Sequence, residues 1–173
     1  MKKRLIAGTC VLIFALFLAP MAGADAVVYP SNQTISLDGE VKTLHAYALK
    51  NEAGFLTNYV KIRDLAALLN FTLAQFNVTW DGEVNLSPGQ SYRSPNGQEG
   101  KAPYDGEQPY IPSTVNTKIS GSYHNMDAFV IYDSEGNGST YYKLRDIAQA
   151  LDFFVTWREG EGMLIDTSIS YRE

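Results

Sequence analysis

One pattern of apolar and polar positions occurs twice in the chain, at residues 59–70 (YVKIRDLAALLN) and 141–152 (YYKLRDIAQALD). In each copy the apolar residues recur at i, i+3, i+4 and i+7, which places them on one face of a helix. These residues are Ile62, Leu65, Ala66 and Leu69 in the first copy, and Leu144, Ile147, Ala148 and Leu151 in the second. A helix of about two to three turns is not stable alone in water. The pattern therefore predicts two short helices that pack on a sheet.

Both copies also carry an arginine followed directly by an aspartate. Asp64 and Asp146 fall in the first turn, where a carboxylate interacts favourably with the helix dipole. Arg63 and Arg145 lie beside the apolar face, where their long stems can cover it. We expect these four residues to hold the fold. The alternative is that the repeated Lys-x-Arg-Asp binds an anion or exchanges a proton.

Segments in which apolar and polar residues alternate, as in strands, precede and follow each predicted helix. Residues 34–49 are expected to form a hairpin with a turn at Asp38-Gly39, a dipeptide typical of such turns. Phe76–Trp80 and residues 83–87 are expected to be strands after the first helix, and residues 163–166 a strand at the end of the chain.

The similarity between the two halves extends beyond the helices. Residues 117–152 align with residues 35–70 without gaps, and Val155-Thr156-Trp157 matches Val78-Thr79-Trp80. The order of strands and helix predicts an α+β protein of two repeated units, each a small twisted antiparallel sheet packed on one short helix. We expect the first unit at residues 25–92 and the second at 113–173. Residues 93–112, rich in Pro, Gly and Tyr, are expected to form a fairly extended linker.

Residues 1–24 have the composition of a signal peptide. A basic segment (Lys2, Lys3, Arg4) precedes an apolar run, which ends at the small residues Ala22-Gly23-Ala24. The alternative, a retained membrane anchor, is disfavoured because the apolar run is shorter than the ~20 residues that a span needs. We therefore expect export and no membrane insertion after cleavage.

Charge and composition exclude several classes of function. The full chain carries a net charge of −5, and the leader holds three basic residues and no acidic one, so the mature chain is more negative still. Nucleic acid as a partner is disfavoured, since it requires a basic surface. The one cysteine, Cys10, lies in the leader, so the mature chain has neither a disulfide nor a thiol nucleophile.

No catalytic or cofactor-binding motif occurs in the sequence. A histidine copper site needs about three imidazoles, and the chain has only His45 and His124, at non-equivalent positions of the two halves. We expect no metal, no cofactor and no enzyme activity. The acidic pairs Asp38/Glu40 and Glu159/Glu161 lie in predicted turns, where carboxylates are usually solvated. A remote alternative is a small glycan hydrolase with another, undetected pair of carboxylates.

Five aromatic residues are the candidate contacts with a partner. Trp80 and Trp157 are either core residues of each unit or flat platforms on which a sugar ring stacks. Tyr104 and Tyr110 in the linker, and Tyr92 directly before it, are candidates because an extended segment offers no core to bury them.

The motif Y-[VY]-K-[IL]-R-D-[LI]-A-x-x-L, followed by V-T-W and a terminal strand, resembles the copper amine oxidase N-terminal-like domain. This "stalk" module occurs in tandem in many secreted proteins of Gram-positive, Clostridium-like bacteria. Arg63, Arg145, Trp80 and Trp157 match signature positions, whereas Lys61 and Lys143 stand where many members have proline. The resemblance implies a twisted antiparallel sheet around one helix, without catalysis. It carries no copper site, because the copper ligands of the oxidases lie in a separate domain.

We therefore expect a secreted, non-catalytic spacer or binding module of the cell envelope that contacts an extracellular protein. The alternative is a module that binds cell-wall polysaccharide. The sequence leaves the oligomeric state open.

Overall fold

The computed structural model describes residues 26–95, 97, 99–101 and 105–172. The expected signal peptide and the candidate contact Tyr104 lie outside the described residues. Strands predominate, and two short helices, α1 (Ile62–Leu68) and α2 (Leu144–Leu151), interrupt them. The α+β class expected from the sequence is therefore confirmed.

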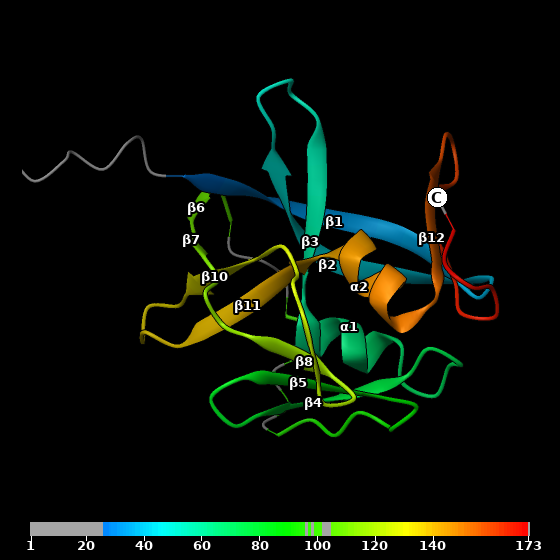
Figure 1. Cartoon of the computed structure of the whole chain (residues 1–173). Helices are drawn as coiled ribbons and strands as arrows, with labels where there is room; N and C mark the ends of the chain where they lie inside the picture. Colours follow the sequence, from blue (N-terminus) through cyan, green and yellow to red (C-terminus); the bar gives the residue numbers. More distant parts are fainter. Residues whose placement is uncertain (1–25, 96, 98, 102–104, 173) are drawn as a thin grey trace, which may run out of the picture.

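The described strands form two sheets (Figure 1). The large, 9-stranded sheet follows the order β12-β13-β1-β2-β3-β11-β10-β7, and β6 pairs with β1 beside this path. Its strands are β1 (Val27–Leu37), β2 (Glu40–Lys50), β3 (Leu56–Lys61), β6 (Gln108–Pro109), β7 (Ile111–Pro112), β10 (Ala128–Tyr132), β11 (Gly138–Lys143), β12 (Phe154–Arg158) and β13 (Gly162–Asp166). The small, 4-stranded sheet has the order β4-β5-β8-β9 and contains β4 (Phe76–Trp80), β5 (Val84–Pro88), β8 (Thr117–Ile119) and β9 (Ser122–His124).

The local predictions hold at the helices and at the first hairpin. Ile62, Leu65 and Ala66 of α1 are buried, as are the corresponding residues of α2. The turn between β1 and β2 is at Asp38-Gly39, and both residues have positive φ, as a two-residue hairpin of this twist requires. The strands before each helix continue to Lys61 and Lys143, so each helix begins three residues after the start of the repeated motif.

The strand pairing differs from the expected pair of separate antiparallel sheets. The last strand, β13, lies parallel to β1, and β5 lies parallel to β8. The hairpin that follows each helix thus joins the first strand of the other half of the chain. A two-stranded hairpin alone is marginal in water and leaves one edge unpaired, so this pairing satisfies backbone groups that an isolated hairpin would expose. The alternation of apolar and polar residues specifies which face of a strand is buried but not which strand pairs with it. The sequence therefore did not predict these pairings.

The two exchanged pairings are reciprocal. Ile35 of β1 faces Met163 of β13, and Thr117 of β8 faces Val84 of β5. Ile35 and Thr117 are aligned in the sequence comparison of the two halves. Between them, β3 pairs with β11 antiparallel, with Val60 opposite Tyr142, and these two residues are also aligned.

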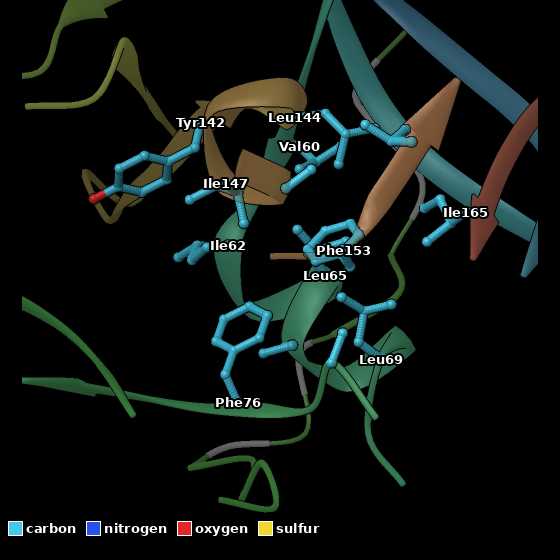
Figure 2. Packing of buried hydrophobic residues seen from close by; sticks show 14 of the residues in the cluster. Val60, Ile62, Leu65, Leu69, Phe76, Tyr142, Leu144, Ile147, Phe153 and Ile165 are labelled. Carbon is cyan, nitrogen blue, oxygen red and sulfur yellow. The ribbon is translucent and has the colours of Figure 1, made fainter. Parts of the chain in front are cut away.

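The main core lies where the two halves meet. Figure 2 shows Leu65 of α1, Leu69 directly after α1, Ile147 of α2, and Phe76 and Phe153 pointing toward one another. All five side chains are fully buried. Since both helices and strands of both sheets contribute to this single cluster, neither half encloses a core by itself.

A second apolar cluster covers the opposite face of the large sheet. It contains Val28, Tyr47, Tyr59, Phe129 and Ile131. The segment expected to be a linker contributes to it, because β6 pairs with β1, β7 pairs with β10, and the Tyr110 ring lies 4.9 Å from that of Phe129. Part of residues 93–112 is therefore packed against the sheet.

We predict that the halves fold only together. Fragments 25–100 and 101–173, produced separately, should each lack cooperative urea unfolding, because each supplies strands to the sheets and side chains to the core of the other. Mixing them should restore the near-ultraviolet circular dichroism of the intact protein. A cooperative transition in either fragment alone would contradict the shared core.

Candidate functional site: two tryptophan clefts

Trp80 and Trp157 are exposed, at 56% and 60% of their surface. Each lies near the end of the first strand of an exchanged hairpin, Trp80 on β4 opposite Val84 and Trp157 on β12 opposite Met163. The alternative that they are core residues is therefore wrong. The buried positions of these strands are filled by Val78 and Val155 instead.

Each tryptophan lines a cleft. The first cleft has a volume of about 410 Å³, and Lys61, Arg63 and Trp80 line it together with Thr79. Its facing wall comes from the second half of the chain and includes residues 138–140 of β11. This volume lies within the range of ligand pockets, roughly 300–1,000 Å³.

The second cleft has a volume of about 640 Å³ and contains the same kinds of residue. Lys143, Arg145 and Trp157 line it together with Thr156. Its facing wall comes from the first half of the chain and includes residues 56–58 of β3.

Most of the residues that line the two clefts correspond in the sequence alignment of the halves. Lys61 and Arg63 align with Lys143 and Arg145, and residues 138–140 align with 56–58. In each cleft one half supplies the indole and both cations, and the other half supplies the facing wall. That wall contains hydroxyl or amide side chains, namely Ser139 and Thr140 in the first cleft and Thr57 and Asn58 in the second, with Ser31 and Gln33 beside them.

Both clefts are cationic. Neither is lined by a carboxylate within the described residues. Lys61 lies 3.9 Å from Asp64 and Lys143 lies 3.4 Å from Asp146, so the predicted acids of the first turn hold the lysines at the cleft margin. Burial raises the pKa of Asp64, and the nearby Lys61 ammonium opposes this shift.

The two arginines have different surroundings. Arg145 is exposed, and neither arginine forms an ion pair with a carboxylate of the described residues. Arg63 is half-buried and lies beside the Tyr92 hydroxyl, whose ionised form it favours. The structure thus places in the clefts two arginines for which the sequence favours a structural role, with anion binding as the alternative.

Tyr92 is buried rather than exposed, with 7% of its surface accessible. Its backbone exchanges two hydrogen bonds with the Asn70 side chain after α1, and its hydroxyl donates to Glu99. Burial, together with the Glu99 carboxylate, raises the pKa of Tyr92 to about 12. The expectation that a linker offers no core was wrong here, because Asn70 ties this segment to the end of α1. Tyr92 is therefore not a free contact, and Tyr110 is half-buried against Phe129.

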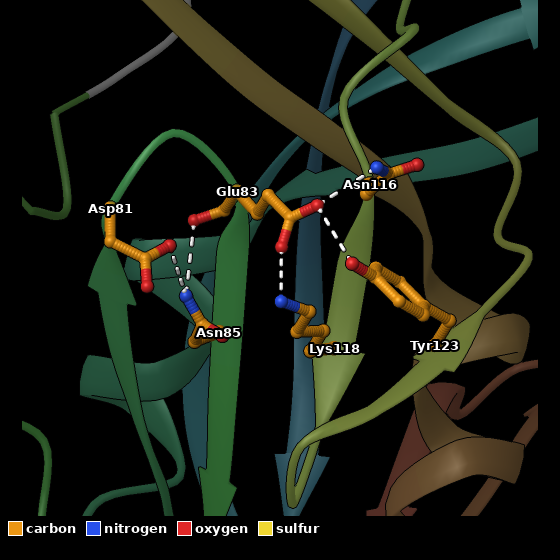
Figure 3. Close-up of polar contacts among 6 residues, drawn as sticks. All are labelled: Asp81, Glu83, Asn85, Asn116, Lys118 and Tyr123. Carbon is orange, nitrogen blue, oxygen red and sulfur yellow. Dashed lines mark hydrogen bonds and ion pairs between the residues drawn. The ribbon is translucent and has the colours of Figure 1, made fainter.

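A polar cluster anchors the turn that follows Trp80 (Figure 3). The Glu83 carboxylate forms an ion pair with Lys118 of β8 and accepts hydrogen bonds from Asn116 at 2.9 Å and Tyr123 at 3.2 Å. Within the turn, Asn85 donates to Asp81 at 2.8 Å. The contacts of Glu83 link the hairpin that carries Trp80 to the other half of the chain. In the second hairpin, Arg158 and Glu161 form an ion pair across the turn at 3.4 Å.

A third cleft, of about 470 Å³, is lined by two carboxylates, Asp38 and Asp166. A glycosidase needs one carboxyl group with a raised pKa as its acid. The opposite holds for Asp166, whose pKa is lowered by hydrogen bonds from Ser168. Asp38 accepts hydrogen bonds from both the backbone and the hydroxyl of Thr167. These carboxylates therefore have the environment of turn-stabilising residues.

The histidines lie apart from the clefts. His45 of β2 shares a hydrogen bond of 2.7 Å with Asn32, and His124 is on β9 at the edge of the small sheet. Within the described part of the chain, no group of three or more His, Cys, Asp or Glu side chains could hold a metal ion.

A scan against protein-family models, a search of the curated proteins and a search of the solved structures each found no match to this chain. Neither described helix is long and apolar enough to cross a membrane.

We predict that Glu83 stabilises the protein in a pH-dependent manner. Its hydrogen bond with Lys118 holds the pKa of Glu83 below its usual range, so its contribution is complete above the unfolded-state pKa of about 4.3 and is lost as the pH falls through the lower folded-state value. Glu83→Gln should therefore lower the urea midpoint at about pH 6 and have little effect at about pH 3. Glu52→Gln, at an exposed site outside the cluster, is the control. An equal decrease in the urea midpoint of Glu83→Gln at both pH values would contradict the role of this ion pair.

Proposed function

We propose that this protein is a secreted, non-catalytic binding module that takes a carbohydrate chain in its two tryptophan clefts. The observation that carries the proposal is that both tryptophans are exposed, and that each lies in a cleft built from corresponding residues. Isolated exposed aromatics are common on protein surfaces. Two exposed tryptophans in matching polar surroundings, however, indicate a shared role in binding.

The chemistry of the clefts suits a sugar. An indole ring provides a flat apolar surface for the apolar face of a pyranose. The hydroxyl and amide groups of Thr57, Asn58, Ser139 and Thr140 can both donate and accept hydrogen bonds, as sugar hydroxyls require. Convergent polar groups beside an apolar surface are typical of small-molecule sites.

The repeated-unit architecture and the resemblance to the copper amine oxidase N-terminal-like domain are part of this proposal. Their support is that the corresponding segments form corresponding elements, since α1 and α2 follow β3 and β11 at aligned positions. The reciprocal registers of the exchanged hairpins favour the same interpretation. The composition of residues 1–24 and the resemblance favour a location outside the cell or in a Gram-positive envelope.

A spacer that contacts an extracellular protein is the second candidate. Phe71 and Leu73 favour it, because these neighbouring apolar side chains are strongly exposed in the loop after α1. Contiguous exposed apolar surface marks protein contacts. The two candidates differ in their ligand and in the surface that binds it.

We predict that the mature protein binds an oligosaccharide from stripped Gram-positive walls at about two sites per chain. Isothermal titration should show that Trp80→Ala and Trp157→Ala each reduce the stoichiometry to about one, because removing the central aromatic of a site abolishes most of its affinity. The double variant should not bind. Phe55→Ala, which removes an exposed aromatic outside both clefts, is the matched control.

Retention of the native protein on walls only when wall proteins are present would favour the spacer, and Phe71→Ala should then weaken retention. Unchanged binding in the double tryptophan variant would contradict the carbohydrate proposal. Urea unfolding of every variant would verify that the fold is retained.

A further inference from the structure

We propose that the clefts select an acidic glycan, in which a sugar ring stacks on the tryptophan and an attached oxyanion binds the neighbouring arginine and lysine. This inference rests on the proposed function and specifies its ligand. The structural feature that carries it is the combination, found twice, of an exposed indole with two cations and no lining carboxylate within the described residues.

The charge of the clefts contrasts with that of the protein. The full chain has a net charge of −5, so a surface without a ligand would on average be acidic. Both clefts instead concentrate positive charge, and Arg145 is exposed without an ion-pair or hydrogen-bond partner among the described residues. A neutral sugar would leave this charge without a role, whereas an acidic one would neutralise it.

The chemistry of the two cations fits one oxyanion. An arginine guanidinium presents a planar fork that can bind two oxygens of a carboxylate or phosphate at once. The lysine ammonium adds a point charge, and its contact with the aspartate at 3.4–3.9 Å is long enough to leave donors available to a ligand. Lysine and arginine lie two residues apart in each half, at the junction where the strand passes into the helix. Both are therefore fixed by regular structure.

A purely structural role would explain Arg63 but not Arg145. Arg63 is half-buried beside Tyr92, and its stem could serve packing. Arg145 is exposed and lines the second cleft, so packing does not account for its position. The shared location of the two guanidinium groups beside an exposed indole is explained by a common ligand.

The oxyanion has two chemical sources in glycans, a uronic acid carboxylate and a phosphate ester. The test uses isothermal titration of the mature protein with hexagalacturonate, with its methyl ester as a neutral form of the same chain, and with a hexose-phosphate oligosaccharide of equal length. At least one charged form should bind about tenfold or more tightly than the ester, as expected for charge-assisted hydrogen bonds. The form that binds identifies the source.

The protein variants separate the clefts from general charge. Arg63→Gln with Arg145→Gln should weaken binding of the charged form about tenfold or more and bring it to the level of the ester. Arg93→Gln, at an exposed arginine that lines neither cleft, should bind as the native protein does. Urea midpoints equal to that of the native protein would show that the arginine variants remain folded.

Any of the following three results would overturn the inference. Equal affinity for the ester and the charged forms would overturn acidic selectivity while the carbohydrate proposal stands. Binding that falls as much in Arg93→Gln as in the double variant would show attraction by general charge and not by the clefts. Absence of binding to every glycan, charged or neutral, would refute both the inference and the proposed function.

Discussion

The backbone pairing between the two halves of the chain is the interaction on which the rest of the structure depends. β13 completes the large sheet beside β1, β5 completes the small sheet beside β8, and β3 and β11 join at Val60 and Tyr142. Without these pairings, two hairpins and one edge each of β1, β3, β8 and β11 would expose unpaired backbone groups. The main core would also be open, because its side chains come from both helices and both sheets.

The same pairing builds the clefts. The exchanged hairpin carries the tryptophan, the helix after β3 or β11 carries the arginine, and the facing wall belongs to the other half of the chain. A cleft therefore exists only when the halves are joined. The turn cluster around Glu83 adds a local constraint, since it connects the hairpin of Trp80 to β8 and β9. The fold and the proposed binding surface both depend on the strand pairing between the halves. Unfolding of this pairing should therefore abolish the clefts as well.

The sequence predicted the features that depend on local periodicity. The apolar faces of α1 and α2, the Asp38-Gly39 turn and the strand that ends at Trp80 were all found as expected. These features are set by residues close in the chain, whose spacing alone specifies the buried face.

The sequence did not predict what depends on distant neighbours. The partner of each hairpin, the burial of Tyr92 and the exposure of the tryptophans all follow from contacts between segments far apart in the chain. A tryptophan at the end of a strand has the same local pattern whether a sheet covers it or not. The polar residues of the facing walls, such as Asn58 and Ser139, were missed for the same reason. The one available signal was the repetition of lysine, arginine and tryptophan at matching positions.

The most direct test of the account is a ¹H–¹⁵N nuclear magnetic resonance titration of the two indole N–H groups. The chain contains only two tryptophans, so each cleft has its own resolved reporter. Addition of an acidic oligosaccharide should shift both indole signals with similar midpoints, whereas its neutral ester should leave them near their starting positions. Binding that shifts neither indole signal would show that the ligand lies elsewhere and would contradict the account.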